Sequence, residues 1–186
     1  MGFIYWVLRL FSLRYYKPMQ RIEGPEFKKI EQYFRQAADV ARTATCHKAH
    51  CGAVIVNDDT VLATGANSPA GGLESQRLCD ATMNTMERPK YDKTCCVHAE
   101  WQAILRATQA HPKQIIGSTL YFMRIDTDGE FTDAGLPFCT VCSRLSLESG
   151  VRYFALYNDG GMDLYDTEEY NLRSYADYST SPKVKN

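Results

Sequence analysis

The sequence predicts an α/β domain in which helices cover a mixed β-sheet. Short apolar runs, typical of buried strands, alternate with longer segments whose apolar residues recur at three- and four-residue spacing, as in helices. Asp58-Asp59 separates the first two apolar runs, which predicts a hairpin and hence an antiparallel pair. The later strand–helix–strand connections predict right-handed crossovers between parallel strands.

The predicted elements have recognisable boundaries. Pro25 suits the first turn of a helix, and Gly150 suits a C-terminal cap. Residues 73–95 are polar without a sustained period, so we expect a lid or an insertion there, and residues 126–134 read as a polar loop. In chain order, we expect a helix over 26–44, strands over 52–57 and 61–65, a helix over 97–110, a strand over 117–123, a helix over 139–150, a strand over 151–157 and a last helix within 164–178.

Length and composition favour one globular domain. With 186 residues, 45% of them hydrophobic, we expect an N-terminal extension over 1–24, the domain over 25–178 and a flexible tail over 179–186. Arg9 and Arg14 interrupt the first apolar run, which is too short and too charged to span a bilayer and lacks a secretory cleavage site. We expect this segment to dock on the domain or on a partner subunit; a membrane-surface anchor and an over-extended translation start stay open.

Charge and cysteine content narrow the function classes. The formal net charge of −1 gives no overall attraction to nucleic acid or membranes. The odd count of seven cysteines, without a secretory signal, favours reduced thiols and metal binding over a disulfide framework, and therefore a cytoplasmic location.

Two short motifs carry the chemistry: His98-Ala-Glu100 and the later pair Cys139-Thr-Val-Cys142. Cysteines three residues apart at a helix start place their thiolates on one side of the first turn, where the helix dipole favours the thiolate form. His98 starts the preceding helix and can supply a nitrogen. Three such ligands would hold zinc and leave one tetrahedral position open, as in catalytic zinc sites.

Glu100 need not bind the metal, because it does not share the face of His98. Beside a zinc-bound water, whose pKa falls from about 16 to about 7, it could take a proton and pass it to the substrate. Attack of the resulting hydroxide on an amine-bearing ring carbon is hydrolytic deamination. The alternative is a closed structural zinc with Cys95 or Cys96 as fourth ligand and Glu100 as an ordinary helix-start carboxylate.

These motifs resemble the cytidine and deoxycytidylate deaminase superfamily over residues 27–157, and its deoxycytidylate (dCMP) deaminase branch above all. The loop Asn67-Ser-Pro-Ala-Gly-Gly72 favours that branch. The resemblance implies a three-layer α/β/α sandwich with a central mixed sheet of about five strands, so a fifth strand should follow Asn158. It also implies conversion of dCMP to dUMP and ammonia by zinc-bound hydroxide. The matching segments are 51–56, 63–72, 97–105 and 139–142.

By this resemblance, His98, Cys139 and Cys142 would ligate zinc and Glu100 would shuttle protons. Asn67 would hold the nucleotide near its sugar, and the backbone of Ala99 would contact the base. Read without the resemblance, Asn67 is a turn former before Ser-Pro. The resemblance also implies a homo-oligomer, with dCTP and dTTP as effectors.

Two positions depart from the family pattern and leave the substrate less defined than the chemistry. Phe138 stands between Pro137 and Cys139, where the family has proline directly before the cysteine. Ala66 stands where the family usually has tyrosine.

A second group of metal-binding residue types lies outside these motifs. Because some relatives in this branch carry an additional structural zinc, the resemblance allows a second zinc here, with Cys46, Cys79 and either Cys95 or His50 as candidate ligands. The alternative is that Cys51 is a small buried hydrophobe and the other cysteines are free thiols.

Other functions stay open at this stage. A deaminase of another small compound, such as cytidine, dCTP or guanine, would use the same motifs. Lys48, Arg77 and Arg88 are candidates for the phosphate site that a nucleotide substrate needs. A tRNA or single-stranded DNA editor would favour a clustered basic groove with stacking aromatics, which the sequence does not show. A non-catalytic zinc module would leave Glu100 beside His98 unexplained.

Overall fold

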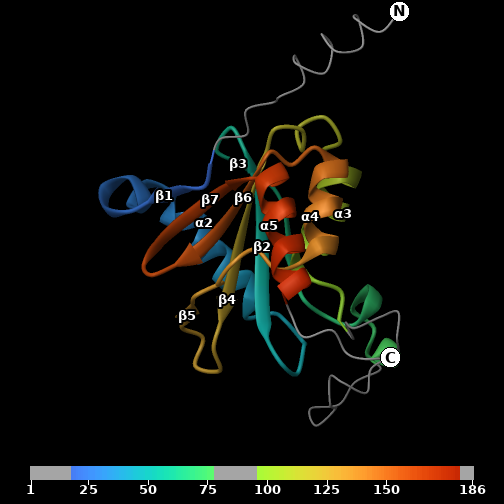
Figure 1. Ribbon diagram of the computed structural model, residues 1–186. Helices are drawn as coiled ribbons and strands as arrows, with labels where there is room; N and C mark the ends of the chain where they lie inside the picture. The colour runs from blue at the N-terminus through green and yellow to red at the C-terminus, as the bar shows by residue number, and fades with distance from the viewer. Residues whose placement is uncertain (1–17, 78–95, 181–186) are drawn as a thin grey trace, which may run out of the picture.

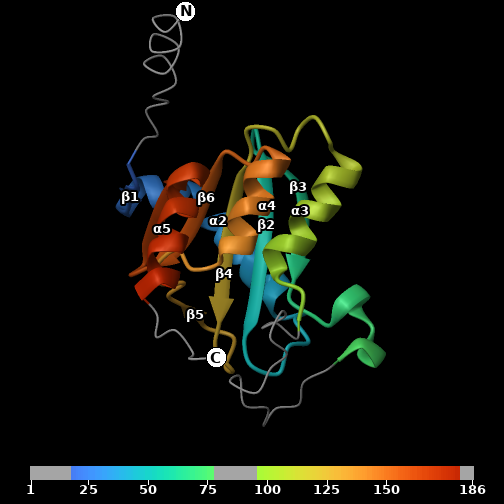
Figure 2. The ribbon, with the colours of Figure 1, turned by 45° about the vertical axis from the view of Figure 1, so that its right-hand side comes forward.

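The computed structural model describes residues 18–77 and 96–180 and shows three layers, with a central sheet between α2 and the group α3, α4 and α5 (Figures 1 and 2). Two short 3₁₀ turns, Ala70–Gly72 and Glu74–Gln76, follow the third strand. The elements are β1 Gln20–Ile22, α2 Gly24–Ala41, β2 His50–Asn57, β3 Thr60–Ala66, α3 Ala99–Ala110, β4 Thr119–Ile125, β5 Phe131–Thr132, α4 Thr140–Ser149, β6 Tyr153–Asn158, β7 Gly161–Asp166 and α5 Thr167–Thr180.

The sheet is mixed, as the sequence predicts. Its strand order is β1-β7-β6-β4-β2-β3, with β5 paired to β4. The β4–β6 pair, joined through α4, is parallel, and the β2–β3 hairpin is antiparallel. The strand expected beyond Asn158 is β7, and β2, β3, β4, β6 and β7 make up the five expected strands.

The sheet nevertheless has seven strands rather than five, because two short strands extend it. β1 comes from the segment expected to be an N-terminal extension and pairs with β7. β5 lies within the expected loop 126–134 and pairs with the end of β4. Strands of three and two residues are too short to show an alternating pattern in the sequence. The remainder of the expected extension, residues 1–17, lies outside the described residues.

The two faces of β2 belong to different hydrophobic clusters. Ala53 and Ile55 face α3, whereas Val54 and Val56 face α2, as the two-residue period of a strand requires. Fully buried Phe34 packs its ring against Tyr121 on the α2 side. Among the described residues, no helix has the length and apolar character needed to cross a bilayer.

Two glycines allow helices to approach the sheet closely, one on each face. A Cβ at Gly52 would overlap the carbonyl oxygen of Ala37 in α2. A Cβ at Gly65 would overlap the carbonyl oxygen of Ala99, the first residue of α3. Gly65 therefore determines how near the start of α3 lies to β3.

Candidate metal centre and active-site pocket

The starts of α3 and α4 bring the two sequence motifs together. His98 is the N-cap of α3, with extended backbone angles, so the helix starts two residues later than residue 97, where we expected it. A short bridge fixes the preceding residue: the Val97 amide donates to the Ser68 carbonyl at 2.8 Å, and the Ser68 amide donates in return at 3.3 Å. Cys139 is the N-cap of α4, and its sulfur accepts a hydrogen bond from the Cys142 amide at 3.2 Å.

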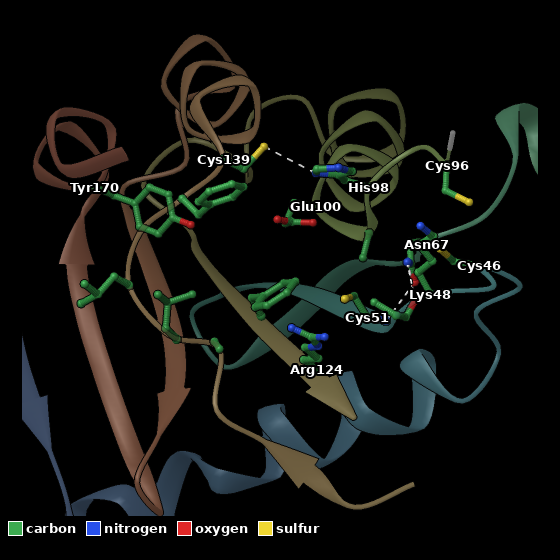
Figure 3. Close-up of a pocket in the computed structure, with 17 residues that line it drawn as sticks. Cys46, Lys48, Cys51, Asn67, Cys96, His98, Glu100, Arg124, Cys139 and Tyr170 are labelled. Atoms are coloured by element: carbon green, nitrogen blue, oxygen red, sulfur yellow. Dashed lines mark hydrogen bonds between the residues drawn. The ribbon is translucent and has the colours of Figure 1, made fainter. Parts of the chain in front are cut away.

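The three predicted metal ligands form a compact cluster (Figure 3). The Nδ1 atom of His98 lies 3.1 Å from the Cys142 sulfur and 3.5 Å from the Cys139 sulfur. All three ligand atoms lie within 4.8 Å of one another. This is the one such group of three or more His, Cys, Asp or Glu side chains within residues 18–77 and 96–180.

This donor set fits zinc. Two thiols and one imidazole are the ligand types that zinc prefers, and three protein ligands leave one tetrahedral position open. Cys96, a fourth ligand in the closed-site alternative, does not belong to the cluster but makes a hydrogen bond with Cys46. Cys95, the other fourth ligand considered, lies outside the described residues.

The three ligand side chains of the cluster shift one another's pKa values. The hydrogen bond from Cys142, with the further contribution of His98, lowers the pKa of Cys139 to about 4 against the effect of burial. Burial lowers the pKa of His98, but its hydrogen bond to Cys139 and the nearby charges raise that pKa to about 9. Burial raises the pKa of Cys142 well above its ordinary value. Because zinc binds thiolate and neutral imidazole, metal binding by these three side chains would release protons.

Glu100 lies in the first turn of α3, and its carboxylate points into the pocket beside the cluster (Figure 3). Its side chain is buried, with 6% of the residue exposed. Burial raises the pKa of this carboxyl, and the nearby His98 only partly opposes that effect. A raised pKa makes this carboxyl a stronger proton acceptor than an exposed glutamate, which suits a proton shuttle.

The cluster and Glu100 line a cavity of about 590 Å³, within the size range of small-molecule sites. Glu100 is the acidic residue among the described lining residues, and Lys48 and Arg124 are the cationic ones. Ala99, expected to contact a base, is fully buried and lines the cavity. The lining residues are Cys46, Lys48, Ala49, Cys51, Asn67, Cys96, His98, Ala99, Glu100, Phe122, Arg124, Ala134, Leu136, Phe138, Cys139, Leu156 and Tyr170.

Asn67, expected to hold the nucleotide, forms hydrogen bonds with the backbone at the start of β2. Its Oδ1 accepts a hydrogen bond from the Cys51 amide at 2.9 Å, and its Nδ2 donates to the Ala49 carbonyl at 2.7 Å. The residue is 7% exposed and still lines the cavity. Asn67 therefore shapes this wall, and one Nδ2 hydrogen and one Oδ1 lone pair of its amide are left for a ligand.

The segment between β5 and α4 forms another wall. The side chain of Asn158 accepts from the Gly135 amide at 2.8 Å and donates to the Gly135 carbonyl at 3.1 Å. The Ala134 amide also donates to the Tyr157 carbonyl at 2.8 Å. These bonds hold the backbone near Phe138, which departs from the family pattern, lines the cavity and is 70% exposed.

The candidate second metal site is only partly described. Cys79 and Cys95 lie outside the described residues, and neither Cys46 nor His50 belongs to a described group of three metal-binding side chains. Burial raises the pKa of the Cys51 thiol to about 12, and the residue is partly buried.

Cys46 differs from Cys51 in its surroundings. Burial raises its pKa, but hydrogen bonds from the Lys48 and Ala49 amides and from Cys96, with the charge of Arg77, lower it on balance. The second zinc therefore stays a prediction.

Sequence reasoning missed several lining residues. Arg124 enters the site because strand register places it opposite Cys51, and Tyr170 enters from α5. Of the candidate phosphate ligands, Lys48 lines the cavity, whereas Arg77 bonds Glu74 and the Thr45 carbonyl. Arg88 lies outside the described residues.

A model of the cytidine and deoxycytidylate deaminase zinc-binding region matches residues 27–157. This range includes the three clustered ligands and Glu100. Comparison with the curated proteins finds no match.

Solved structures share the fold at low sequence identity. The dCMP deaminase of cyanophage S-TIM5, in complex with dCMP and dUMP, is 23% identical over 71% of this chain and 81% of that chain, with a TM-score of 0.50. The cytidine deaminase of Burkholderia pseudomallei is 17% identical over 75% of this chain and 94% of that chain, also with a TM-score of 0.50.

Proposed function

Because the chain belongs to the cytidine and deoxycytidylate deaminase zinc-binding family, we propose that it converts dCMP and water to dUMP and ammonia. The observation that carries the proposal is the compact cluster of His98, Cys139 and Cys142 with buried Glu100 beside it in one cavity. Three ligands and a separate carboxylate are what hydrolytic deamination needs.

The metal ligands and the apolar lining residues have separate roles, which follow from their positions in the cavity. His98, Cys139 and Cys142 would hold zinc at the cavity wall, and a bound zinc ion would supply Lewis-acid activation of a water molecule. The α3 and α4 starts fix the ligand backbones, so the cluster needs little rearrangement to bind. The apolar lining side chains Phe122 and Leu156 would hold the pyrimidine ring and exclude bulk water.

Glu100 would move the protons. Its carboxylate would accept a proton from the attacking water and deliver it to the ring nitrogen next to the amine-bearing carbon. The second water proton would pass by the same carboxylate to the departing amine, which leaves as ammonia while the carbon gains a carbonyl oxygen. Burial raises the Glu100 pKa, which favours acceptance of the water proton by this carboxylate.

The choice of dCMP over other cytosine compounds has two supports. The loop Asn67-Ser-Pro-Ala-Gly-Gly72 resembles the dCMP deaminase branch, and its first residue lines the cavity. The cyanophage enzyme of similar fold is a dCMP deaminase. A cytidine deaminase of comparable structural similarity makes the unphosphorylated nucleoside the second candidate substrate.

The test is ammonia release by the purified zinc-loaded protein with dCMP, dCTP, deoxycytidine, cytidine and guanine as separate substrates. We expect dCMP to give the highest kcat/KM. A higher kcat/KM for cytidine or guanine than for dCMP would show that dCMP is not the preferred substrate. Absence of turnover with all five compounds, in protein shown to contain zinc, would contradict the enzyme proposal.

A further inference from the structure

Arg124 is a cation on the cavity-facing side of β4. It lies two residues after Phe122, so both side chains project from the same face of the strand, and both line the cavity. In the β2–β4 register, Arg124 is opposite Cys51, which lines the same cavity. Figure 3 shows the guanidinium on the sheet side of the cavity, across from Glu100 and the starts of α3 and α4.

The backbone at Arg124 is held by strands on both sides. β2 pairs with it through Cys51, and β5 pairs with it through Thr132. The Thr132 hydroxyl also donates a hydrogen bond to the Arg124 carbonyl at 3.1 Å. A side chain on a strand paired on both edges has a defined origin, which makes it suited to positioning a ligand.

The charge of Arg124 is not neutralised by the described parts of the protein. No Asp or Glu of residues 18–77 or 96–180 lies within ion-pair distance of it, unlike Arg21, Arg152 and Arg173, which form ion pairs. The acid that shares the cavity, Glu100, is buried on the opposite side. This side of the cavity is therefore suited to an anion.

A planar guanidinium matches the oxygens of a phosphate monoester in a two-pronged contact. Resting on the proposed function, we propose that Arg124 is the residue by which this protein selects substrates carrying a phosphate. The amine-bearing end of the substrate would lie at Glu100, and its phosphate would lie at Arg124.

The test compares dCMP with deoxycytidine, which differ only in the phosphate, in the wild type and in Arg124→Ala. A lost charged hydrogen bond corresponds to roughly a tenfold to hundredfold change. We expect Arg124→Ala to lower kcat/KM for dCMP by that factor, mainly through KM, and to leave kcat/KM for deoxycytidine within about twofold. Arg124→Lys should fall between the two, because lysine keeps the charge without the planar pair of donors.

Arg35→Ala is the matched control, since Arg35 is an exposed arginine of α2 on the other side of the sheet. Arg35→Ala should leave kcat/KM unchanged for both dCMP and deoxycytidine. Zinc content and thermal unfolding of each variant show that the centre and the fold persist. Equal losses for dCMP and deoxycytidine, or an unchanged preference in Arg124→Ala, would overturn the assignment.

A binding measurement separates failure of this inference from failure of the proposed function. In a Glu100→Gln background, dCMP should bind more weakly when Arg124 is also replaced by alanine, whereas deoxycytidine should bind equally to both proteins. Absence of turnover in the wild type together with this binding pattern would reject the reaction and keep the phosphate site. Turnover of dCMP without any effect of the Arg124 substitution on dCMP binding would reject the phosphate site and keep the proposed reaction.

Discussion

The two faces of the sheet are packed by the same means but contain different chemistry. On each face a glycine of the β2–β3 hairpin admits a helix backbone: Gly52 admits α2, and Gly65 admits α3. The α2 face is closed by apolar and aromatic side chains around Phe34. The α3 face buries a comparable apolar cluster but leaves a cavity where it meets α4, with Glu100 inside.

The difference shows how a site can be built without giving up a core. The α2 face contributes stability and needs no polar groups in its centre. The α3 face places its polar residues at helix starts, where unpaired backbone N–H groups favour thiolates. Substitutions on the α2 face should therefore change stability alone, and substitutions on the α3 face should also change turnover.

The largest effect is expected from Glu100→Gln. Loss of a proton shuttle should lower kcat by about 10²- to 10⁴-fold, while the three-ligand cluster keeps its zinc. Glu148→Gln, at an exposed position of α4, is the control. Ammonia release and metal analysis are the measurements. Loss of zinc together with activity would favour the closed structural site instead.

Phe34→Ala and Phe154→Ala compare the two faces directly. Both side chains are fully buried, so each truncation should lower the free energy of unfolding by about 3–5 kcal/mol. Phe154 stacks on Tyr170, a cavity-lining residue, at 4.0 Å between ring centroids. Phe154→Ala should therefore also reduce kcat/KM, whereas Phe34→Ala should not. Urea unfolding and kinetics at a temperature where both variants are folded measure this, and equal kinetic losses would contradict the division between the faces.

Gly52→Ala and Gly65→Ala test the close helix approaches. Each added Cβ forces a helix backbone away from the sheet, with an expected cost of about 1–3 kcal/mol or somewhat more. Only Gly65→Ala displaces Ala99, next to His98, so only this variant should also weaken zinc retention. Thermal unfolding with zinc in excess and with a chelator present distinguishes them. Zinc loss in Gly52→Ala would show that the faces are coupled.

The smallest effect is expected from Tyr33→Phe on the α2 side. The Tyr33 hydroxyl donates to Asp59 Oδ1 at 3.0 Å, and its loss should cost about 1 kcal/mol.

The Tyr33 and Tyr121 hydroxyls make the free energy of unfolding depend on pH in the alkaline range. Burial, with the nearby Asp59, raises the Tyr33 pKa, and burial raises that of Tyr121 to about 12. Since both folded-state pKa values lie above the unfolded value of about 10, this contribution is complete below pH about 10 and is lost as the pH rises toward 12. Tyr121→Phe should flatten that decline in urea unfolding measured between about pH 10 and 12. An unchanged decline would place the titrating group elsewhere.

The sequence predicted the grouping of His98, Cys139 and Cys142 because motif spacing reports local geometry. Cysteines three residues apart at a helix start must share a side, and in the structure both sulfur atoms lie within 4.8 Å of each other. The hairpin around Asp58-Asp59 was predictable for the same reason. The short strands β1 and β5 were not predictable. They are strands because they pair with β7 and β4, and their own residues show no alternating pattern.

The residues that the sequence did not reveal enter the site through long-range packing. Arg124 faces the cavity because of its register with β2, and a shift by one residue would turn it to the other face. Tyr170 depends on how α5 lies against β6 and β7. Asn67 is predicted to contact the nucleotide, but one donor and one acceptor position of its amide bond Ala49 and Cys51, which are distant in sequence.

The origin of the ligands on two helices has a consequence for folding. His98 and Cys139 lie 41 positions apart in the sequence, with α3, β4 and β5 between them. An ion bound between them would act as a crosslink that closes this long loop, and closing a loop removes conformational freedom from the unfolded chain. Metal supply would then govern how much folded protein persists, as well as how fast that protein works.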